Sequence, residues 1–344
     1  MARGKILTQG RSKHFEVDGP VRELDELSRS VPSDPSELEA FFMEDLFPLL
    51  DLGGWVSLLL EGTEEGELLT FGGAAAALGA PRGAKGIAEW VSIGKVKGPV
   101  HRMVRGDGTP LGPRGGPVLS GREVSPILDR PPFSALARVQ SAMSPLLKGG
   151  DGGRRRALCG LDISTKGGSQ AAALVPVLLS GEVLEGLTSF SGPTFPYIPG
   201  FLFYKEAPHL MPLIRKAVSR GIMEDGILVL DGNGTLHPRG MGIACQLGMA
   251  MDLPSFGIAK RLLTGSVGPW AQERGVESAA IEVNGSHMGD ALRKEGRLPI
   301  YVSRGHRTVQ GECRELAVDM LNGVIPSPTR LAHVRANEAR RSEP

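Results

Sequence analysis

The chain has 344 residues, of which 41% are apolar, and its formal net charge at neutral pH is only +1. This length predicts about two domains with ordinary hydrophobic cores. Because the chain is not a polycation, any contact with nucleic acid must come from a local basic surface.

Cysteine usage and hydropathy predict the compartment. Cys159, Cys245 and Cys313 are far apart, which argues against a disulfide framework and a zinc site and fits a reducing cytoplasm. Residues 1–19 lack the apolar centre of a signal peptide, and no apolar run approaches the length that spans a bilayer. We therefore expect a cytoplasmic protein that is not inserted in a membrane. No obligate protein partner is evident from the sequence.

Three segments are expected: residues 1–37, which suggest no function, a front domain at 38–130, and a larger domain at 131–344. Within the front domain, residues 68–92 predict a helix-turn-helix, with a small-residue helix, a Pro-Arg-Gly turn and a second helix beginning near Ala84. Cations that suit phosphate contacts gather in and after these helices, chiefly Arg82, Lys85, His101 and Arg102. A run of charges is often only a solvated surface, but its position on a helix-turn-helix favours DNA binding.

Together with residues 98–102, this pattern resembles the alkylguanine-DNA alkyltransferase family over about residues 38–130. That family removes alkyl groups from guanine in DNA with a cysteine nucleophile. Val100 stands at the cysteine position and has no lone pair, so alkyl transfer is impossible there. Phe71 replaces the family's tyrosine, and Lys85 replaces its arginine finger. The resemblance implies a small, mostly helical winged helix-turn-helix domain that binds DNA, either at alkylated guanine or nonspecifically.

Glycine and proline are frequent in residues 106–132, which predict a wing followed by a linker. Residues 133–147 have helical periodicity and are expected to open the second domain. An apolar strand follows at 157–164 and contains Asp162, an acid that is costly there unless a cation or donors satisfy it. Two more strands are predicted at 170–179 and 185–190. Strands in series, followed by strand-helix alternation, predict an α/β domain with antiparallel strands first and parallel strands after.

The stretch at 226–260 carries the strongest chemical pattern. A buried strand at 226–230 ends at Asp231, Gly232 and Gly234 permit a tight turn, and a helix is expected at about 241–251. A second buried strand at 255–259 ends at Lys260. A right-handed crossover makes these strands parallel, and ligands of such sheets bind at the carboxyl ends of the strands. Asp231 and Lys260 are therefore predicted to lie side by side.

Four short motifs in this stretch, Asp231-Gly-Asn-Gly, His237-Pro-Arg, Gly242-Ile-Ala and Gly257-Ile-Ala-Lys, resemble the endonuclease V family. Those enzymes nick nucleic acid beside deaminated bases, chiefly inosine. Further matches at 195–206, 304–306 and 326–333 extend the resemblance over about residues 135–340. It implies an RNase H-like mixed sheet flanked by helices. Asn233 departs from the histidine that is commoner in the glycine turn.

Two prolines flank Tyr197 and Ile198 and stiffen their loop. A stiff, exposed aromatic-aliphatic tip can insert into a base stack. The resemblance implies that this loop is the family's strand-separating wedge, and an ordinary proline-rich turn is the alternative.

Asp162, Glu206 and Asp231 supply three carboxylates from two strands and a helix start. Hard oxygen ligands suit Mg²⁺, with Mn²⁺ as an expected substitute. Such a metal activates water and stabilises a leaving oxygen, while Lys260 would neutralise charge on the phosphate. The resemblance also places His333 beside the metal, and a histidine on the helix surface is the alternative.

A flipped purine needs a close-fitting slot. The resemblance implies a base pocket of backbone and small or aliphatic side chains, formed by Leu202, Gly232, Gly234, Gly242, Ile243, Gly257 and Leu263. His237 has two open interpretations, a phosphate or base contact and a structural role. We expect a Mg²⁺-dependent DNA repair endonuclease that cuts on the 3′ side of inosine. The alternatives are an inosine-specific ribonuclease and a non-catalytic lesion-binding protein.

Overall fold

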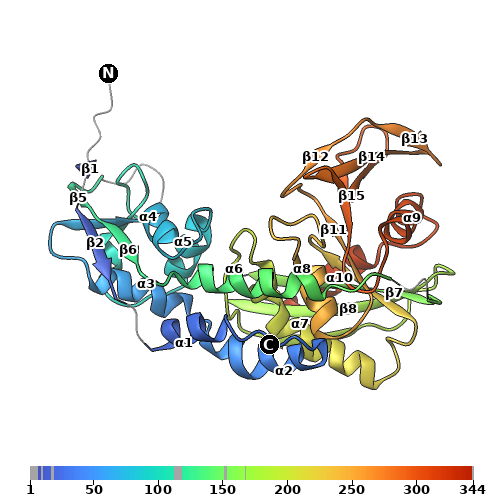
Figure 1. The fold of residues 1–344 in the computed structure, drawn as a ribbon, viewed down its shortest axis with the longest axis horizontal. Coiled ribbons are helices and arrows are strands. Elements are labelled where there is room, and N and C mark those ends of the chain that lie inside the picture. The colour runs from blue at the N-terminus through green and yellow to red at the C-terminus, as the bar shows by residue number, and fades with distance from the viewer. Residues whose placement is uncertain are drawn as a thin grey trace. The chain divides into compact units, whose positions relative to one another are not determined.

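The computed structural model describes residues 7–8, 11–16, 19–111, 118–150, 153–166 and 168–342, and they form two compact units (Figure 1). The front unit contains residues up to 30, 44–139 and 194–199. The main unit contains residues 31–43, 140–193 and 200–344. The two units are therefore discontinuous in sequence, whereas a single boundary between residues 130 and 131 was expected.

The front unit is built on short parallel strand pairs. A four-stranded sheet has the order β1 (Leu7–Thr8), β5 (Gly121–Glu123), β3 (Glu67–Thr70) and β4 (Met103–Val104), and a separate pair joins β2 (Ser12–Phe15) to β6 (Ser125–Leu128). The helices of this unit are α1 (Pro20–Leu27), α3 (Leu52–Glu61), α4 (Phe71–Ala77), α5 (Ala84–Ser92) and α6 (Pro132–Met143), the last as far as Val139.

Both helices of the predicted helix-turn-helix are present as α4 and α5. The hydroxyl of Thr70 accepts a hydrogen bond from the Gly73 amide at 2.9 Å, which satisfies a free donor at the start of α4. The linker prediction is wrong for 121–128, because β5 and β6 pair with other strands there. The winged arrangement stays a prediction.

The main unit contains a ten-stranded mixed sheet in the order β12-β14-β15-β16-β11-β10-β7-β8-β9, with β13 paired to β14. Its strands are β7 (Ala157–Lys166), β8 (Ser169–Leu178), β9 (Leu187–Ser191), β10 (Gly226–Asp231), β11 (Ser255–Ala259), β12 (Ser266–Val267), β13 (Ala271–Glu273), β14 (Val276–Val283), β15 (Ser286–Arg293) and β16 (Ile300–Arg304). β7, β10 and β11 are parallel, whereas β7-β8-β9 and β11-β16 are antiparallel. This register confirms the predicted mixture of antiparallel and parallel strands.

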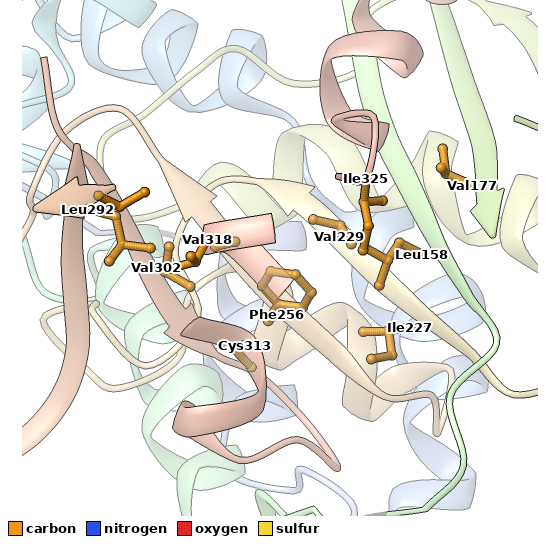
Figure 2. Close-up of a cluster of buried hydrophobic side chains, with 12 residues drawn as sticks. Leu158, Val177, Ile227, Val229, Phe256, Leu292, Val302, Cys313, Val318 and Ile325 are labelled. Atoms are coloured by element: carbon orange, nitrogen blue, oxygen red, sulfur yellow. The ribbon is translucent and has the colours of Figure 1, made fainter. Parts of the chain in front are cut away.

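Helices α2 (Leu38–Ala40), α7 (Leu202–Ser219), α8 (Ile243–Ala250), α9 (Gln310–Leu321) and α10 (Pro328–Arg341) belong to the same unit. Alternation along β11 separates the two faces of the sheet. Phe256 packs with Val229 of β10 and Val318 of α9 in the main core (Figure 2). Its neighbour Ser255 points the other way and donates to the Ala244 carbonyl of α8 at 2.7 Å. Among the described residues, no helix is both long and apolar enough to cross a membrane.

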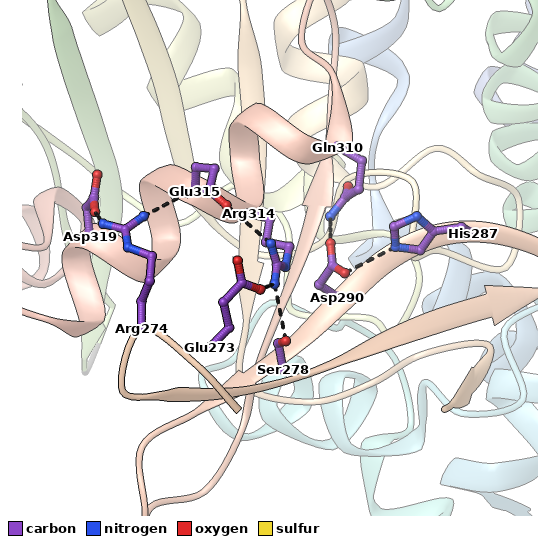
Figure 3. A network of polar contacts seen from close by, with 9 residues as sticks. All are labelled: Glu273, Arg274, Ser278, His287, Asp290, Gln310, Arg314, Glu315 and Asp319. Atoms are coloured by element: carbon purple, nitrogen blue, oxygen red, sulfur yellow. Dashed lines mark hydrogen bonds and ion pairs between the residues drawn. The ribbon is translucent and has the colours of Figure 1, made fainter. Parts of the chain in front are cut away.

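Strands β12 to β15 were not predicted from the sequence. Ion pairs with α9 stabilise this part of the sheet. Figure 3 shows those that join β13 and the residue after it to α9. Arg314 of α9 donates to Glu273 of β13 and to Ser278 of β14. Arg274, which follows β13, pairs with Asp319 of α9 at 2.5 Å. These contacts attach the edge of the sheet to α9.

Candidate active site

Two carboxylates and a lysine meet where the parallel strands β10 and β11 end beside β7. Leu230 of β10 pairs with Leu161 of β7, so Asp231 and Asp162 follow at neighbouring positions. Lys260 comes directly after β11 and donates to Asp231 Oδ2 at 2.5 Å. The predicted proximity of Asp231 and Lys260 is confirmed.

His333 reaches this edge from α10. Its Nδ1 lies 2.8 Å from Asp162 Oδ2, and its Nε2 lies 3.0 Å from the side-chain amide nitrogen of Asn337. Because the amide nitrogen is a donor, Nε2 accepts and Nδ1–H donates to the carboxylate. The hydroxyl of Ser164 donates to Asn337 Oδ1 at 2.8 Å and extends the chain of bonds. This network fixes the ring of His333 against Asp162.

Gly160 explains how α10 comes so close to β7. A Cβ at Gly160 would lie 2.1 Å from the carbonyl carbon of Pro328, at the start of α10. Only a residue without a side chain lets the helix contact the strand here. The sequence analysis missed Gly160, whose place inside an apolar strand was the available signal.

Glu206 lies in α7, is partly buried and interacts electrostatically with both aspartates. Burial raises the pKa of Glu206 to about 8, and the charges of Asp162 and Asp231 add to the rise. Burial also raises the pKa of Asp162, against the lowering effect of His333. The three carboxylates therefore repel one another. In the part of the chain that the structure describes, no three His, Cys, Asp or Glu side chains are gathered as a ready-made metal cluster.

A cavity of about 300 Å³ opens beside this edge. Asp231, Lys260, Arg330 and His333 form its polar side, and Ile258 and Met320 contribute to its apolar side. The site thus combines acids, a lysine, a histidine and a concave space, the combination expected of a hydrolytic site on a charged substrate. This cavity was not predicted.

Comparison with known proteins identifies the fold and its family. The Endonuclease V family model matches residues 146–334. Endonuclease V of Rhodospirillum centenum is 36% identical over 229 residues, which cover 62% of this chain and 91% of that protein. The chain belongs to the endonuclease V family. The match begins beyond the front domain, so the alkyltransferase-like resemblance of residues 38–130 stays a prediction.

Solved structures agree with this assignment. Human endonuclease V has a TM-score of 0.54 and 29% identity, covering 61% of this chain and 98% of that chain. Endonuclease V of Ciona intestinalis, in complex with a 23mer DNA containing an inosine followed by a ribo-adenosine, has a TM-score of 0.52 and 18% identity. That alignment covers 61% of this chain and 97% of the Ciona chain, and it shows a shared fold. The protein is a nuclease with the mixed α/β fold of this family.

Some residues of the predicted base pocket are neighbours in the structure. A Cβ at Gly232 would lie 2.6 Å from Ile243 Cγ2 and 3.2 Å from Leu202 Cδ2, so these three residues lie together. Leu263, also predicted, is half-buried in the segment after β11. Leu202, Gly232 and Ile243 thus form a small, mostly buried apolar cluster beside Asp231.

The other three glycines of the predicted pocket pack backbone against backbone. A Cβ would lie 2.0 Å from the Arg304 oxygen at Gly234, 2.0 Å from the Asn233 oxygen at Gly242, and 2.2 Å from the Gly232 oxygen at Gly257. Their absent side chains therefore make room for the glycine turn itself.

His237 is buried, and both of its ring nitrogens have partners. Nε2 lies 3.1 Å from the Gly200 carbonyl, and Nδ1 accepts from the Arg239 amide at 3.3 Å. Burial lowers the pKa of His237 to about 4, and the Arg239 charge adds to this effect. A neutral ring held in this way favours the structural interpretation.

The residues predicted to contact DNA in the front unit differ in exposure. Arg82, Lys85 and His101 are exposed. Arg102 is half-buried and donates from Nη1 to the Thr63 carbonyl at 2.5 Å, which ties part of its guanidinium to the protein. Tyr197 is 44% exposed, but Ile198 is fully buried in the front unit, so the expectation of an exposed Ile198 is wrong.

Proposed function

We propose that this protein is a metal-dependent DNA repair endonuclease that hydrolyses a phosphodiester on the 3′ side of inosine, with Mg²⁺ as its metal. The observation that carries the proposal is the pair Asp162 and Asp231, with which Glu206 of α7 interacts electrostatically. Lys260 donates a hydrogen bond to Asp231, and His333 donates one to Asp162. The inosine-containing DNA in the Ciona structure supports the substrate. Membership in a family of metal-dependent nucleases supports the metal.

The donor set fits a hard divalent cation. Three carboxylates supply only oxygen ligands. A cation would offset the burial that raises the pKa of Glu206 and the repulsion from Asp162 and Asp231 that adds to the rise. Asp162, Glu206 and Asp231 are the residues that would hold it. When bound, such an ion supplies an activated water and stabilises the leaving oxygen.

The protein's own groups orient these ligands and the substrate. His333 donates to Asp162 and fixes which carboxylate oxygen is available. Lys260 is 77% exposed in its side chain, so its ammonium can contact a substrate phosphate while staying close to Asp231. Donation from Lys260 to a phosphate oxygen would stabilise charge that develops during hydrolysis.

A nicking assay on matched inosine-containing DNA and RNA tests the proposal. Each strand carries one inosine, and Mg²⁺, Mn²⁺ or an excess of chelator is added. We expect DNA nicking with either metal, mapped to the 3′ side of inosine, and none with chelator. Cutting of RNA alone would establish the ribonuclease, binding without cutting would establish the lesion-binding protein, and full activity in chelator would refute the metal-dependent mechanism.

For the front unit, we propose duplex DNA binding without alkyl transfer, through the exposed Arg82 and Lys85 of the helix-turn-helix. Each lost phosphate contact lowers the slope of log K against log salt by about 1. The double variant Arg82→Ala/Lys85→Ala should therefore bind inosine-free duplex with a slope reduced by about 2. An unchanged slope would refute these contacts. Duplexes with and without alkylated guanine decide whether the unit also reads that lesion.

A further inference from the structure

The segment Thr194–Pro199 lies inside the family match, but its contacts place it in the front unit. We call it the Thr194–Pro199 loop. Its Phe195 packs at 6.0 Å, between ring centroids, from both Trp55 of α3 and Phe133 of α6. All three rings are buried, so the core of the front unit includes a residue from the larger domain's sequence.

Two glycines of the helix-turn-helix accommodate the same loop. Ile198 is 0% exposed, and a Cβ at Gly83 or Gly86 would lie 3.3 or 2.7 Å from its Cδ1. At Gly86 that Cβ would also lie 2.5 Å from the Tyr197 carbonyl oxygen. Gly86 lies inside α5, where glycine is unfavourable without a packing reason. Contact with the loop supplies that reason.

The exposed groups around this contact suit nucleic acid. Ile198 is buried, so Tyr197, which is 44% exposed, is the residue of this pair that faces solvent. Arg82 and Lys85, both exposed, are the sequence neighbours of the two glycines that contact the loop. An aromatic face beside cations is the arrangement with which proteins stack on bases and contact the backbone.

The carboxyl end of the loop is fixed as well. Gly200 follows the loop with a φ of 84°, and its carbonyl accepts hydrogen bonds from Gln140, His237 and Arg239 at 3.2, 3.1 and 2.8 Å. The loop therefore runs from an aromatic core to a carbonyl with three donors, and little of it is free to move.

We propose that α5 and the Thr194–Pro199 loop form one nucleic-acid-reading surface, in which Gly83 and Gly86 seat the loop, Tyr197 stacks on a base, and Arg82 and Lys85 contact the adjoining backbone. The inference rests on the proposed function. The family resemblance already implies that the loop separates strands, and what is added here is that α5 of the front unit seats the loop and contacts the backbone beside it. The front unit is then a positioning part of the nuclease and not only a tether to DNA.

The variant Gly86→Ala tests the seat, and Gly72→Ala is its matched control. A Cβ at Gly86 collides with the loop, whereas a Cβ at Gly72, in the adjacent helix α4, meets no described atom within 4 Å. The same inosine strand is supplied single-stranded and in a duplex, because only a duplex must be opened. The ratio of duplex to single-strand nicking should fall about tenfold in Gly86→Ala, the loss of roughly one stacked base, and stay at the wild-type value in Gly72→Ala. A wild-type ratio in Gly86→Ala overturns the proposal.

Tyr197→Ala gives a second test that leaves the loop's packing in place, since the removed ring is largely exposed. A 2-aminopurine beside inosine reports unstacking by its fluorescence when protein binds in the presence of chelator. Wild-type protein should increase the 2-aminopurine fluorescence of the duplex, and Tyr197→Ala should not. If Gly86→Ala proves unfolded by thermal denaturation, Tyr197→Ala decides: equal brightening overturns the proposal. This readout needs no cutting, so an absence of nicking by wild-type protein refutes the proposed function separately.

Discussion

Replacing Lys260 with alanine distinguishes two possible roles of this residue, a catalytic group and a member of a surface ion pair. The Lys260 side chain is 77% exposed and that of Asp231 is 29% exposed, so their bond at 2.5 Å is strongly screened by solvent. Exposed pairs of this kind stabilise a protein by about 0–1 kcal/mol. In a unit of this size, that corresponds to a fall in Tm of at most about 4 °C.

The effect on catalysis should be much larger. Removing one group that stabilises charge developing in the transition state typically lowers kcat by about 10²–10³. We therefore expect single-turnover nicking of inosine DNA by Lys260→Ala to slow by about that factor, with a nearly unchanged Tm. Lys294→Ala, which removes the same charge from an exposed turn between β15 and β16, is the control and should nick at the wild-type rate. A wild-type rate in Lys260→Ala would show that the lysine forms only a surface pair.

Three other variants address the carboxylates and their support. Asp231→Asn should abolish nicking but bind inosine DNA within about threefold of wild type in a fluorescence anisotropy titration, since it removes one metal ligand and leaves the binding surface. The pKa of Glu206 is raised from 4.5 to about 8 in the folded, metal-free protein. An acid whose pKa is raised by folding favours the folded state only while it is protonated. Metal-free wild type should therefore lose stability relative to Glu206→Gln as the pH rises from 4.5 to 8. The expected loss of unfolding free energy, measured by denaturant titration, is on the order of a few kcal/mol. Equal pH dependence in the two proteins would contradict that shift. Gly160→Ala should push the start of α10 at Pro328 away from β7, lowering stability by about 1–3 kcal/mol and slowing nicking, whereas Gly192→Ala, whose Cβ would meet no described atom within 4 Å, should do neither.

The catalytic edge was predictable because its signals are local. The strand at Ser255–Ala259 matches the prediction to the residue, since a short apolar run there is bounded by Pro254 and Lys260. The crossover rule then makes β10 and β11 parallel, which brings Asp231 and Lys260 to one edge. The role of His333 was predicted only from the family resemblance. Its hydrogen bond to Asp162 depends on Gly160, because the missing side chain at Gly160 lets α10 pack against β7.

The missed elements depend on partners far away in the sequence. Strands β12 and β13 are only two and three residues long, and apolar and polar residues do not alternate strictly in β14 and β15. The edge of these strands is held by ion pairs with α9, between Arg274 and Asp319 and between Glu273 and Arg314. Ile198 looked like an exposed tip because two prolines flank it. Its burial comes from α5, more than a hundred residues earlier, and no periodicity or turn rule connects the two segments.

The discontinuous front unit has a consequence for the order of folding during synthesis. Its aromatic core needs Trp55, Phe133 and Phe195, and the residues between positions 139 and 194 belong to the main unit. A ribosome adds about 5–20 residues per second, so Phe195 follows Phe133 by roughly 3 to 12 seconds. During that interval Trp55 and Phe133 lack their third ring, while strands β7 to β9 are already being made. The front unit therefore completes its aromatic core only after the first three strands of the main unit's sheet have been synthesised.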